Sequence, residues 1–142
     1  MNPTLRNVLA VFAGTFAGLL LIGLMEVISA KIYPPPPGVD FTNREAVKAY
    51  VAGASTGMFL IVLLGYTLGP LIAAWLATGL AATNHRRRGL TVGALFLTAS
   101  ILNLREIPHP TWFWVANIVL VVMAAVIGTR AGASGILPAS RS

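Results

Sequence analysis

The segment from residue 51 to residue 83 reads VAGASTGMFLIVLLGYTLGPLIAAWLATGLAAT and carries no charged side chain. A helix that crosses the hydrocarbon core of a bilayer needs about 20 apolar residues, each rising ~1.5 Å. Because this segment is longer than that, we expect its helix to tilt, to project beyond the bilayer, or to bend at Gly69-Pro70, where proline removes a backbone hydrogen bond. The segment therefore predicts a membrane-spanning helix.

The composition of the whole chain supports the same conclusion. Of its 142 residues, 56% are hydrophobic and 10% are charged, and the mean hydropathy is +0.80. A soluble domain carries about 25% charged residues, because polar groups must cover its surface. We therefore expect most of the outer surface to face lipid. The chain has no cysteine, which excludes disulfides, thiol redox chemistry and thiolate metal ligands.

Four apolar segments predict transmembrane spans, at residues 8–30, 51–83, 89–104 and 111–129. The first is longer than the apolar core of a secretory signal peptide, about 7–15 residues, so we expect it to remain uncleaved. The predicted fold is an all-α membrane protein, a four-transmembrane-helix bundle that forms a single domain over residues 1–131. Residues 132–142 are expected to be a disordered tail.

The distribution of Lys and Arg predicts the orientation of these spans, because cytoplasmic connections carry an excess of basic residues. Acidic residues offset most of the basic ones in the connections at 31–50 and 105–110. The opposite side carries basic residues only, namely Arg6, Arg86, Arg87, Arg88, Arg130 and Arg141. Both termini are therefore expected in the cytoplasm, with two proline-containing hairpins outside.

The first outer connection, residues 31–50, is expected to be ordered. Pro34 to Pro37 favour an extended, polyproline-like strut. Thr42 and Glu45 have the spacing of a capping box, so a short helix is predicted at about 43–50. The connection could be a rigid hairpin, which we favour, or a ledge on which a partner docks.

Small side chains recur at every fourth position of the second span: Gly65, Gly69, Ala73, Ala77 and Ala81. Lipid supplies no hydrophobic force between helices, so helices associate where small residues let their backbones approach. This small-residue stripe could close the bundle internally or join the subunits of a homo-oligomer. We favour internal packing.

Glu26 is the most informative polar residue. It lies about one turn inside the outer end of the first span, where a carboxylate is costly unless it is paired, protonated or hydrated. Arg105, at the end of the short third span, is expected at nearly the same depth, and its forked donors suit a carboxylate. Two interpretations stay open: a structural Glu26–Arg105 pair, and a Glu26 that binds a proton or a cation.

The second outer connection, LREIPHPTWFW at residues 104–114, is predicted to be a polar turn with helix-breaking prolines and tryptophans that anchor at headgroup level. Asn117, two turns into the last span, is expected to hydrogen-bond to another helix. Together these segments predict a polar binding cluster at the outer leaflet. Its members are Glu26, Arg105, Glu106, His109 and Asn117.

On the cytoplasmic side, Arg86, Arg87 and Arg88 are candidates for binding anionic lipid headgroups. No basic stripe is interleaved with exposed aromatic residues, so nucleic acid is not an expected partner. His85 and His109 are expected on opposite sides of the membrane and cannot share a metal. Nucleotide-binding, zinc-protease and Ser-His-Asp patterns are absent, so no cofactor, metal or catalytic set is predicted.

Two segments resemble parts of small four-helix inner-membrane proteins of bacteria: EVISAKIYPPPPG at residues 26–38 and IPHPTWFW at residues 107–114. The resemblance covers most of the chain. No activity is established for those proteins, so the resemblance implies a fold and a location and no functional residue.

Three classes of function remain. A non-enzymatic accessory, scaffold, or lipid- or partner-binding membrane protein is favoured, because it needs only the small-residue stripe, the rigid loop and the anchors; its partners would be membrane lipids or a larger membrane complex. The alternative is a homo-oligomeric transporter or channel in which Glu26 binds a proton or a cation. An enzyme that uses Glu26, Arg105 and His109 on a lipid-soluble substrate is the least favoured.

Overall fold

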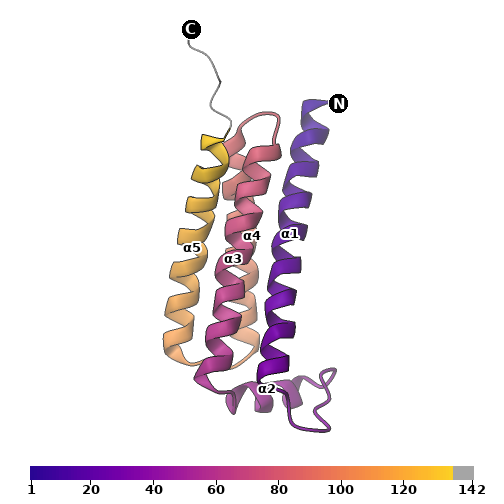
Figure 1. Cartoon of the computed structure of the whole chain (residues 1–142), viewed down its shortest axis with the longest axis vertical. Coiled ribbons are helices and arrows are strands. Elements are labelled where there is room, and N and C mark those ends of the chain that lie inside the picture. Colours follow the sequence, from indigo (N-terminus) through magenta and orange to yellow (C-terminus); the bar gives the residue numbers. More distant parts are fainter. Residues whose placement is uncertain (136–142) are drawn as a thin grey trace.

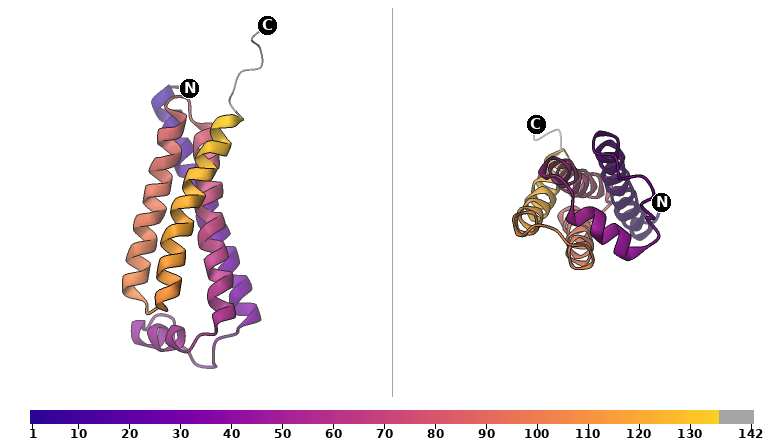
Figure 2. Two further views of the ribbon diagram at one scale, coloured as in Figure 1. Left: turned by 90° about the vertical axis from the view of Figure 1, so that its left-hand side faces the viewer. Right: turned by 90° about the horizontal axis from the view of Figure 1, so that it is seen from below.

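The computed structural model describes residues 1–135, which form five α-helices. Their bounds are α1 Pro3–Ile32, α2 Arg44–Ala52, α3 Thr56–Leu80, α4 His85–Glu106 and α5 Thr111–Ser134. The four long helices stand side by side, and the short α2 lies across one end of them (Figure 1; Figure 2). α1, α3 and α5 are each long and apolar enough to cross a membrane, as fits an integral membrane protein.

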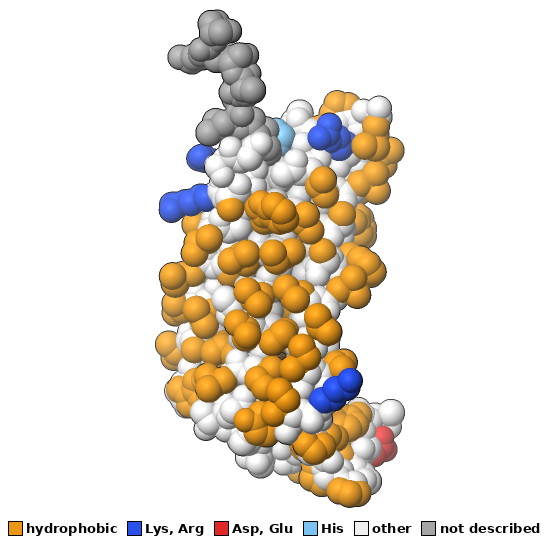
Figure 3. Space-filling view, in the orientation of Figure 1, with side chains coloured by type: hydrophobic (Ala, Val, Ile, Leu, Met, Phe, Trp, Pro, Cys, Tyr) orange, Lys and Arg blue, Asp and Glu red, His pale blue; other side chains and the backbone are white. Residues whose placement is uncertain are grey.

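The outer surface is largely apolar. Hydrophobic side chains cover the middle of the face in Figure 3, and the Lys and Arg side chains on that face lie toward its ends. Phe12, Phe16 and Val115 are among the most exposed, at 69%, 64% and 61%. An apolar surface this extensive marks contact with a membrane rather than with water.

Prolines and caps set where the long helices begin and end. Asn2 caps α1 by accepting a hydrogen bond from the Thr4 amide at 2.8 Å. The run of prolines that begins at Pro34 ends α1 at Ile32, because the residue before a proline is biased away from helical backbone. Ile107, which precedes another proline, is likewise extended and ends α4.

The short helix α2 starts at Arg44, and its cap is Asn43 rather than Thr42. The Asn43 side chain accepts a hydrogen bond from the Glu45 amide at 3.0 Å. Thr42 is already engaged, because its hydroxyl and its amide donate to Asp40 at 2.6 and 2.8 Å and lower the pKa of that carboxyl. The capping box predicted at Thr42 and Glu45 is therefore wrong by one residue.

The uncharged segment 51–83 does not form one helix. Its first residues complete α2, a corner follows, and α3 begins after Ser55, whose hydroxyl accepts from the Met58 amide at 3.3 Å. Pro70 lies inside α3 without interrupting it. The extra length of segment 51–83 is thus accounted for by a turn between α2 and α3. The sequence had predicted a tilted, a projecting or a bent helix, and none of these includes such a turn.

The last helix, α5, continues to Ser134, beyond residue 132, where a disordered tail was expected to begin. The Ser134 hydroxyl donates to the Ala131 carbonyl at 2.8 Å within the final turn. The rest of the predicted tail, residues 136–142, lies outside the described residues.

The central helix is α3, which packs against α1, α4 and α5. Its small-residue stripe lets α1 approach closely: a Cβ atom placed on Gly18 of α1 would lie 2.7 Å from the Gly69 carbonyl oxygen and 2.9 Å from the Ala73 Cβ. The stripe thus packs helices within the chain, the arrangement that the sequence favoured. By contrast, α1 contacts α4 much less than it contacts α3.

Hydrogen bonds from Arg6 and Asn7, which we call the polar clasp, join the first turns of α1 to the residues at the end of α3. Asn7 is 5% exposed, and its Oδ1 accepts from the amides of Ala82 and Thr83 at 2.8 and 3.2 Å. Its Nδ2 donates to the Thr83 hydroxyl at 2.9 Å, and Arg6 Nε donates to the Leu80 carbonyl at 2.9 Å. The Leu80 carbonyl is one of those that the C-terminal end of a helix leaves without a partner, and the Ala82 and Thr83 amides belong to the turn between α3 and α4.

Candidate functional site

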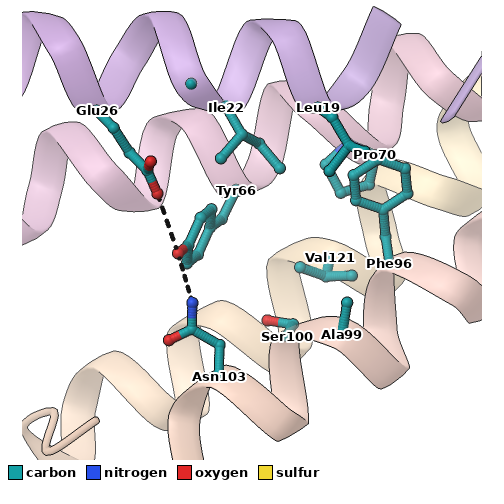
Figure 4. A pocket seen from close by; sticks show the side chains of 11 residues that line it. Leu19, Ile22, Glu26, Tyr66, Pro70, Phe96, Ala99, Ser100, Asn103 and Val121 are labelled. Atoms are coloured by element: carbon teal, nitrogen blue, oxygen red, sulfur yellow. Dashed lines mark hydrogen bonds between the residues drawn. The ribbon is translucent and has the colours of Figure 1, made fainter. Parts of the chain in front are cut away.

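Three polar side chains from three helices form a hydrogen-bonded row near the α2 end of the bundle (Figure 4). Asn103 Nδ2 of α4 donates to the Tyr66 hydroxyl at 2.9 Å, and the Tyr66 hydroxyl of α3 donates to Glu26 Oε1 of α1 at 3.4 Å. The Glu26–Tyr66–Asn103 row therefore connects α1 to α4 through α3, where the two outer helices otherwise contact each other little.

On one side of the row lies a pocket of about 310 Å³, open on one side, which we call the mid-bundle pocket. Figure 4 shows the row at one end of this pocket and apolar side chains at the other. Besides the row, it is lined by Leu19, Ile22, Gly23, Pro70, Phe96, Ala99, Ser100 and Val121. An apolar cavity with polar groups at one end is suited to an amphipathic molecule.

The same row also lines a second pocket, of about 330 Å³, which we call the α2 pocket because α2 and its preceding loop form part of its wall. Its remaining lining residues are Ser29, Ala30, Pro35, Phe41, Val47, Tyr50, Val51, Met58, Phe59, Val62, Ile107 and His109. The row is thus a wall shared by two pockets that follow one another along the bundle.

His109 enters the α2 pocket with a defined tautomer. Its ring stacks on Phe113, with centroids 4.8 Å apart, and its Nδ1 lies 2.8 Å from the Ile107 carbonyl oxygen. A carbonyl only accepts, so Nδ1 carries the proton and Nε2 of the neutral ring is an acceptor. Burial lowers the pKa of His109 more than the bond to Ile107 raises it, which favours the neutral ring.

Two buried polar atoms that line the α2 pocket have no hydrogen-bond partner among the described residues: the Ser29 hydroxyl and Asn103 Oδ1. Ser29 is 2% exposed. Because buried polar groups are almost always paired, such atoms mark a place that a ligand or water completes.

The structure separates the five residues of the predicted polar cluster. Glu26 and His109 line the same pocket, whereas Arg105 is exposed at the end of α4 and forms no salt bridge with Glu26. Glu106 pairs instead with Arg44, an exposed contact that ties α2 to α4.

Asn117, the fifth member, lies in the interior. Its side chain is fully buried and accepts a hydrogen bond from the Ser100 hydroxyl of α4. This is the interhelical bond that the sequence predicted. Its Nδ2 has no partner among the described residues.

The sequence did not point to Tyr66 and Asn103, although each carries a weak signal. Tyr66 stands in a long uncharged segment, and Asn103 is the amide at the outer end of the third predicted span. The sequence predicted Arg105 instead as the partner of Glu26, because its charge is opposite to that of a carboxylate.

The basic residues Arg86, Arg87 and Arg88 lie in the first turn of α4, at the end of the bundle opposite α2 (Figure 1). Arg86 and Arg87 are exposed, as lipid-headgroup binding requires. Arg88 is half-buried, and its Nε has no partner in the described part of the chain. Residues 1–135 contain no group of acidic and histidine side chains that could hold a metal ion.

Comparison of the chain with protein-family models, with characterised proteins and with solved structures gives no match. The function therefore has to be argued from the geometry of the two pockets.

Proposed function

We propose that this protein is a non-enzymatic accessory or scaffold protein that binds a membrane lipid in the mid-bundle pocket. The observation that carries the proposal is the pocket itself, which is open, lined almost wholly by apolar side chains and closed at one end by the Glu26–Tyr66–Asn103 row. Leu19, which lines the pocket, is 56% exposed, and Leu20 and Leu102, next to lining residues in the chain, are 58% and 55% exposed. In a bilayer, lipid is therefore the molecule most concentrated around this opening.

The proposal places α1, α3, α4 and α5 in the inner membrane of a bacterium, with both termini cytoplasmic and α2 outside. α4 is the least apolar of the four, because three arginines begin it, but it runs beside the others (Figure 1). In this orientation the row lies just below the outer headgroups. The helix rises about 10 Å toward the midplane over the seven residue steps from Glu26 back to Leu19, which accommodates part of an acyl chain.

A binding role suits the row better than catalysis. It consists of a carboxylate, a phenol and an amide. The Tyr66 hydroxyl and the Glu26 carboxylate could serve as nucleophile and base, but their oxygens lie 3.4 Å apart, beyond the distance of about 2.6–3.2 Å at which a base activates a nucleophile. These three side chains can bind a ligand through hydrogen bonds and through the shape of the pocket that they line.

The test fills the pocket without disturbing the fold. A Cβ placed on Gly23, which lines the mid-bundle pocket, meets no atom within 4 Å, and the same holds for Gly79 at the far end of α3. We expect Gly23→Leu to lose the lipid that wild type retains in native mass spectrometry after gentle extraction. Gly79→Leu, the matched control, should keep it. Equal lipid retention by both variants would contradict the proposal.

A second candidate is the homo-oligomeric transporter or channel. One observation favours it: Glu26 forms no salt bridge in the described part of the chain, and it lies on the wall between two pockets. The same mass spectra give the number of subunits, and liposome flux tests the role of Glu26. Flux that Glu26→Gln abolishes would support transport, whereas a monomer without proton or cation flux would refute it.

A further inference from the structure

We infer that the α2 pocket binds the primary ammonium headgroup of a zwitterionic phospholipid whose acyl chain occupies the mid-bundle pocket. The inference rests on the proposed lipid-binding function and adds the class of lipid. Its geometric basis is the shared wall: Glu26, Tyr66 and Asn103 line both pockets, so a molecule bound against these three side chains lies next to both pockets, with its head on one side of the row and its tail on the other.

The hydrogen-bond directions within the row leave mainly acceptors for a ligand. Asn103 Nδ2 donates to Tyr66, and the single hydroxyl proton of Tyr66 is donated to Glu26. What remains is the second carboxylate oxygen of Glu26, the second N–H of Asn103 Nδ2, and the buried Asn103 Oδ1, which has no partner among the described residues. A ligand that completes the row must therefore donate.

The rest of the α2 pocket has the same character. His109 Nε2 is an acceptor, because Nδ1 is committed to the Ile107 carbonyl. The Ser29 hydroxyl, more than nine-tenths buried and without a partner in the described part of the chain, can accept as well. Acceptors thus come from α1, from α4 and from the α4–α5 connection.

The charge of the α2 pocket also favours a ligand that donates hydrogen bonds. Glu26 is the charged residue among those lining the α2 pocket, and no Lys or Arg is among them. An anionic headgroup would meet a carboxylate and several acceptors with no cation to neutralise it. An ammonium group would instead form charge-assisted hydrogen bonds, which are the stronger kind.

The number of N–H donors separates two zwitterionic headgroups of equal charge. Ethanolamine ends in an ammonium with three N–H groups, whereas the three methyl groups of choline leave none. Choline would fill the space and leave the buried acceptors unpaired, which carries a penalty. We therefore expect phosphatidylethanolamine to bind better than phosphatidylcholine.

The experiment uses the full chain in vesicles of equal parts dioleoyl phosphatidylethanolamine and dioleoyl phosphatidylglycerol, with the bound lipids identified by native mass spectrometry. We expect wild type to retain the ethanolamine lipid about tenfold over the glycerol lipid, the ratio that one charge-assisted hydrogen bond gives. Glu26→Gln keeps an acceptor for Tyr66 but removes the charge, so the preference should fall toward parity. Glu45→Gln, on α2 outside the pocket, should retain it.

A second comparison replaces the glycerol lipid by dioleoyl phosphatidylcholine, and Asn103→Leu should then reduce the preference for ethanolamine. Parity in wild type, or a preference for glycerol or choline, would overturn the headgroup assignment while lipid binding itself persists. Wild type that retains no lipid at all would overturn both the headgroup assignment and the proposed function. The two failures are therefore distinguishable.

Discussion

The two halves of α1 contact the bundle in opposite ways. In the first half, up to residue 18, Asn7, Ala10, Gly14 and Gly18 are buried, whereas in the second half only Ser29 is buried. Gly18 has backbone and side-chain atoms of α3 and α4 around its missing Cβ, and Gly23 has nothing within 4 Å. The first half is a packed interface, whereas the second half contacts α3 through Ile22 and Met25 and also forms one wall of two pockets.

The difference shows that apolar character does not by itself decide where a membrane helix packs. Both halves are strongly apolar, but only the first combines small residues with a polar clasp, at Asn7, whose partners are all supplied. The second half carries Glu26 and the Ser29 hydroxyl, which has no hydrogen-bond partner within residues 1–135. We therefore expect the first half of α1 to contribute more to the stability of the fold, and the second half to contribute more to ligand binding.

The strongest test of this contrast makes the same substitution in each half. Gly18→Leu should destabilise the protein by about 3 kcal/mol, because its Cβ would be 2.7 Å from a backbone carbonyl that cannot move aside. Gly23→Leu should leave the free energy of unfolding nearly unchanged. Denaturant unfolding of both variants in one detergent measures the difference. Similar losses would show that the open half is packed after all.

A second test compares two asparagines. Asn7→Ala should cost about 2 kcal/mol, because it leaves the amides of Ala82 and Thr83 without their acceptor. Asn103→Ala should cost less, because one of its two polar atoms has no partner to lose. Asn7→Asp, which preserves the acceptor, is the control and should recover part of the loss. An equal cost for both alanine variants would weaken the contrast.

Ser29 allows a sharper test, because removing a buried group without a partner relieves a penalty. Ser29→Ala should leave lipid-free protein as stable as wild type or stabilise it by up to about 1 kcal/mol. Ser55→Ala, which removes the cap of α3, should instead cost about 1 kcal/mol. Thermal unfolding of delipidated protein checks both. A loss at Ser29 as large as that at Ser55 would mean that its hydroxyl has a partner.

The smallest expected effect is on pH dependence. The folded state lowers the pKa of His109, so the unfolded chain binds a proton more readily. The neutral His109 ring therefore makes its full contribution to the free energy of unfolding above the pKa of the unfolded chain, about 6.5. This contribution is lost as the pH falls through the lowered pKa of the folded state. His109→Phe keeps the stacking on Phe113 but cannot titrate, so it should flatten the decline in melting temperature between about pH 7 and pH 5. An unchanged decline would rule out His109 as its source.

Much of the secondary structure was predictable because its causes are local. Hydropathy marked the apolar helices, the prolines at 34–37 and 108 marked where helices end, and Pro110 marked where α5 begins. The corner at residues 53–55 was not predictable from hydropathy, because its residues are as uncharged as those of the helices around it. The cap of α2 was misplaced because two neighbouring residues, Thr42 and Asn43, are both good caps, and only the contact with Asp40 decides between them.

The candidate site was predictable only in part. The sequence by itself determined that the chain is apolar and helical and that Glu26 is a polar group in an apolar helix, since these depend on residues near each other in the chain. Only the tertiary structure decided that Glu26 meets Tyr66 rather than Arg105 and that Asn103 completes the row. The partner of a side chain on a helix depends on which helices are neighbours and how each is rotated about its axis. Here the close α1–α3 contact through glycine and alanine sets both, and it leaves α1 and α4 apart.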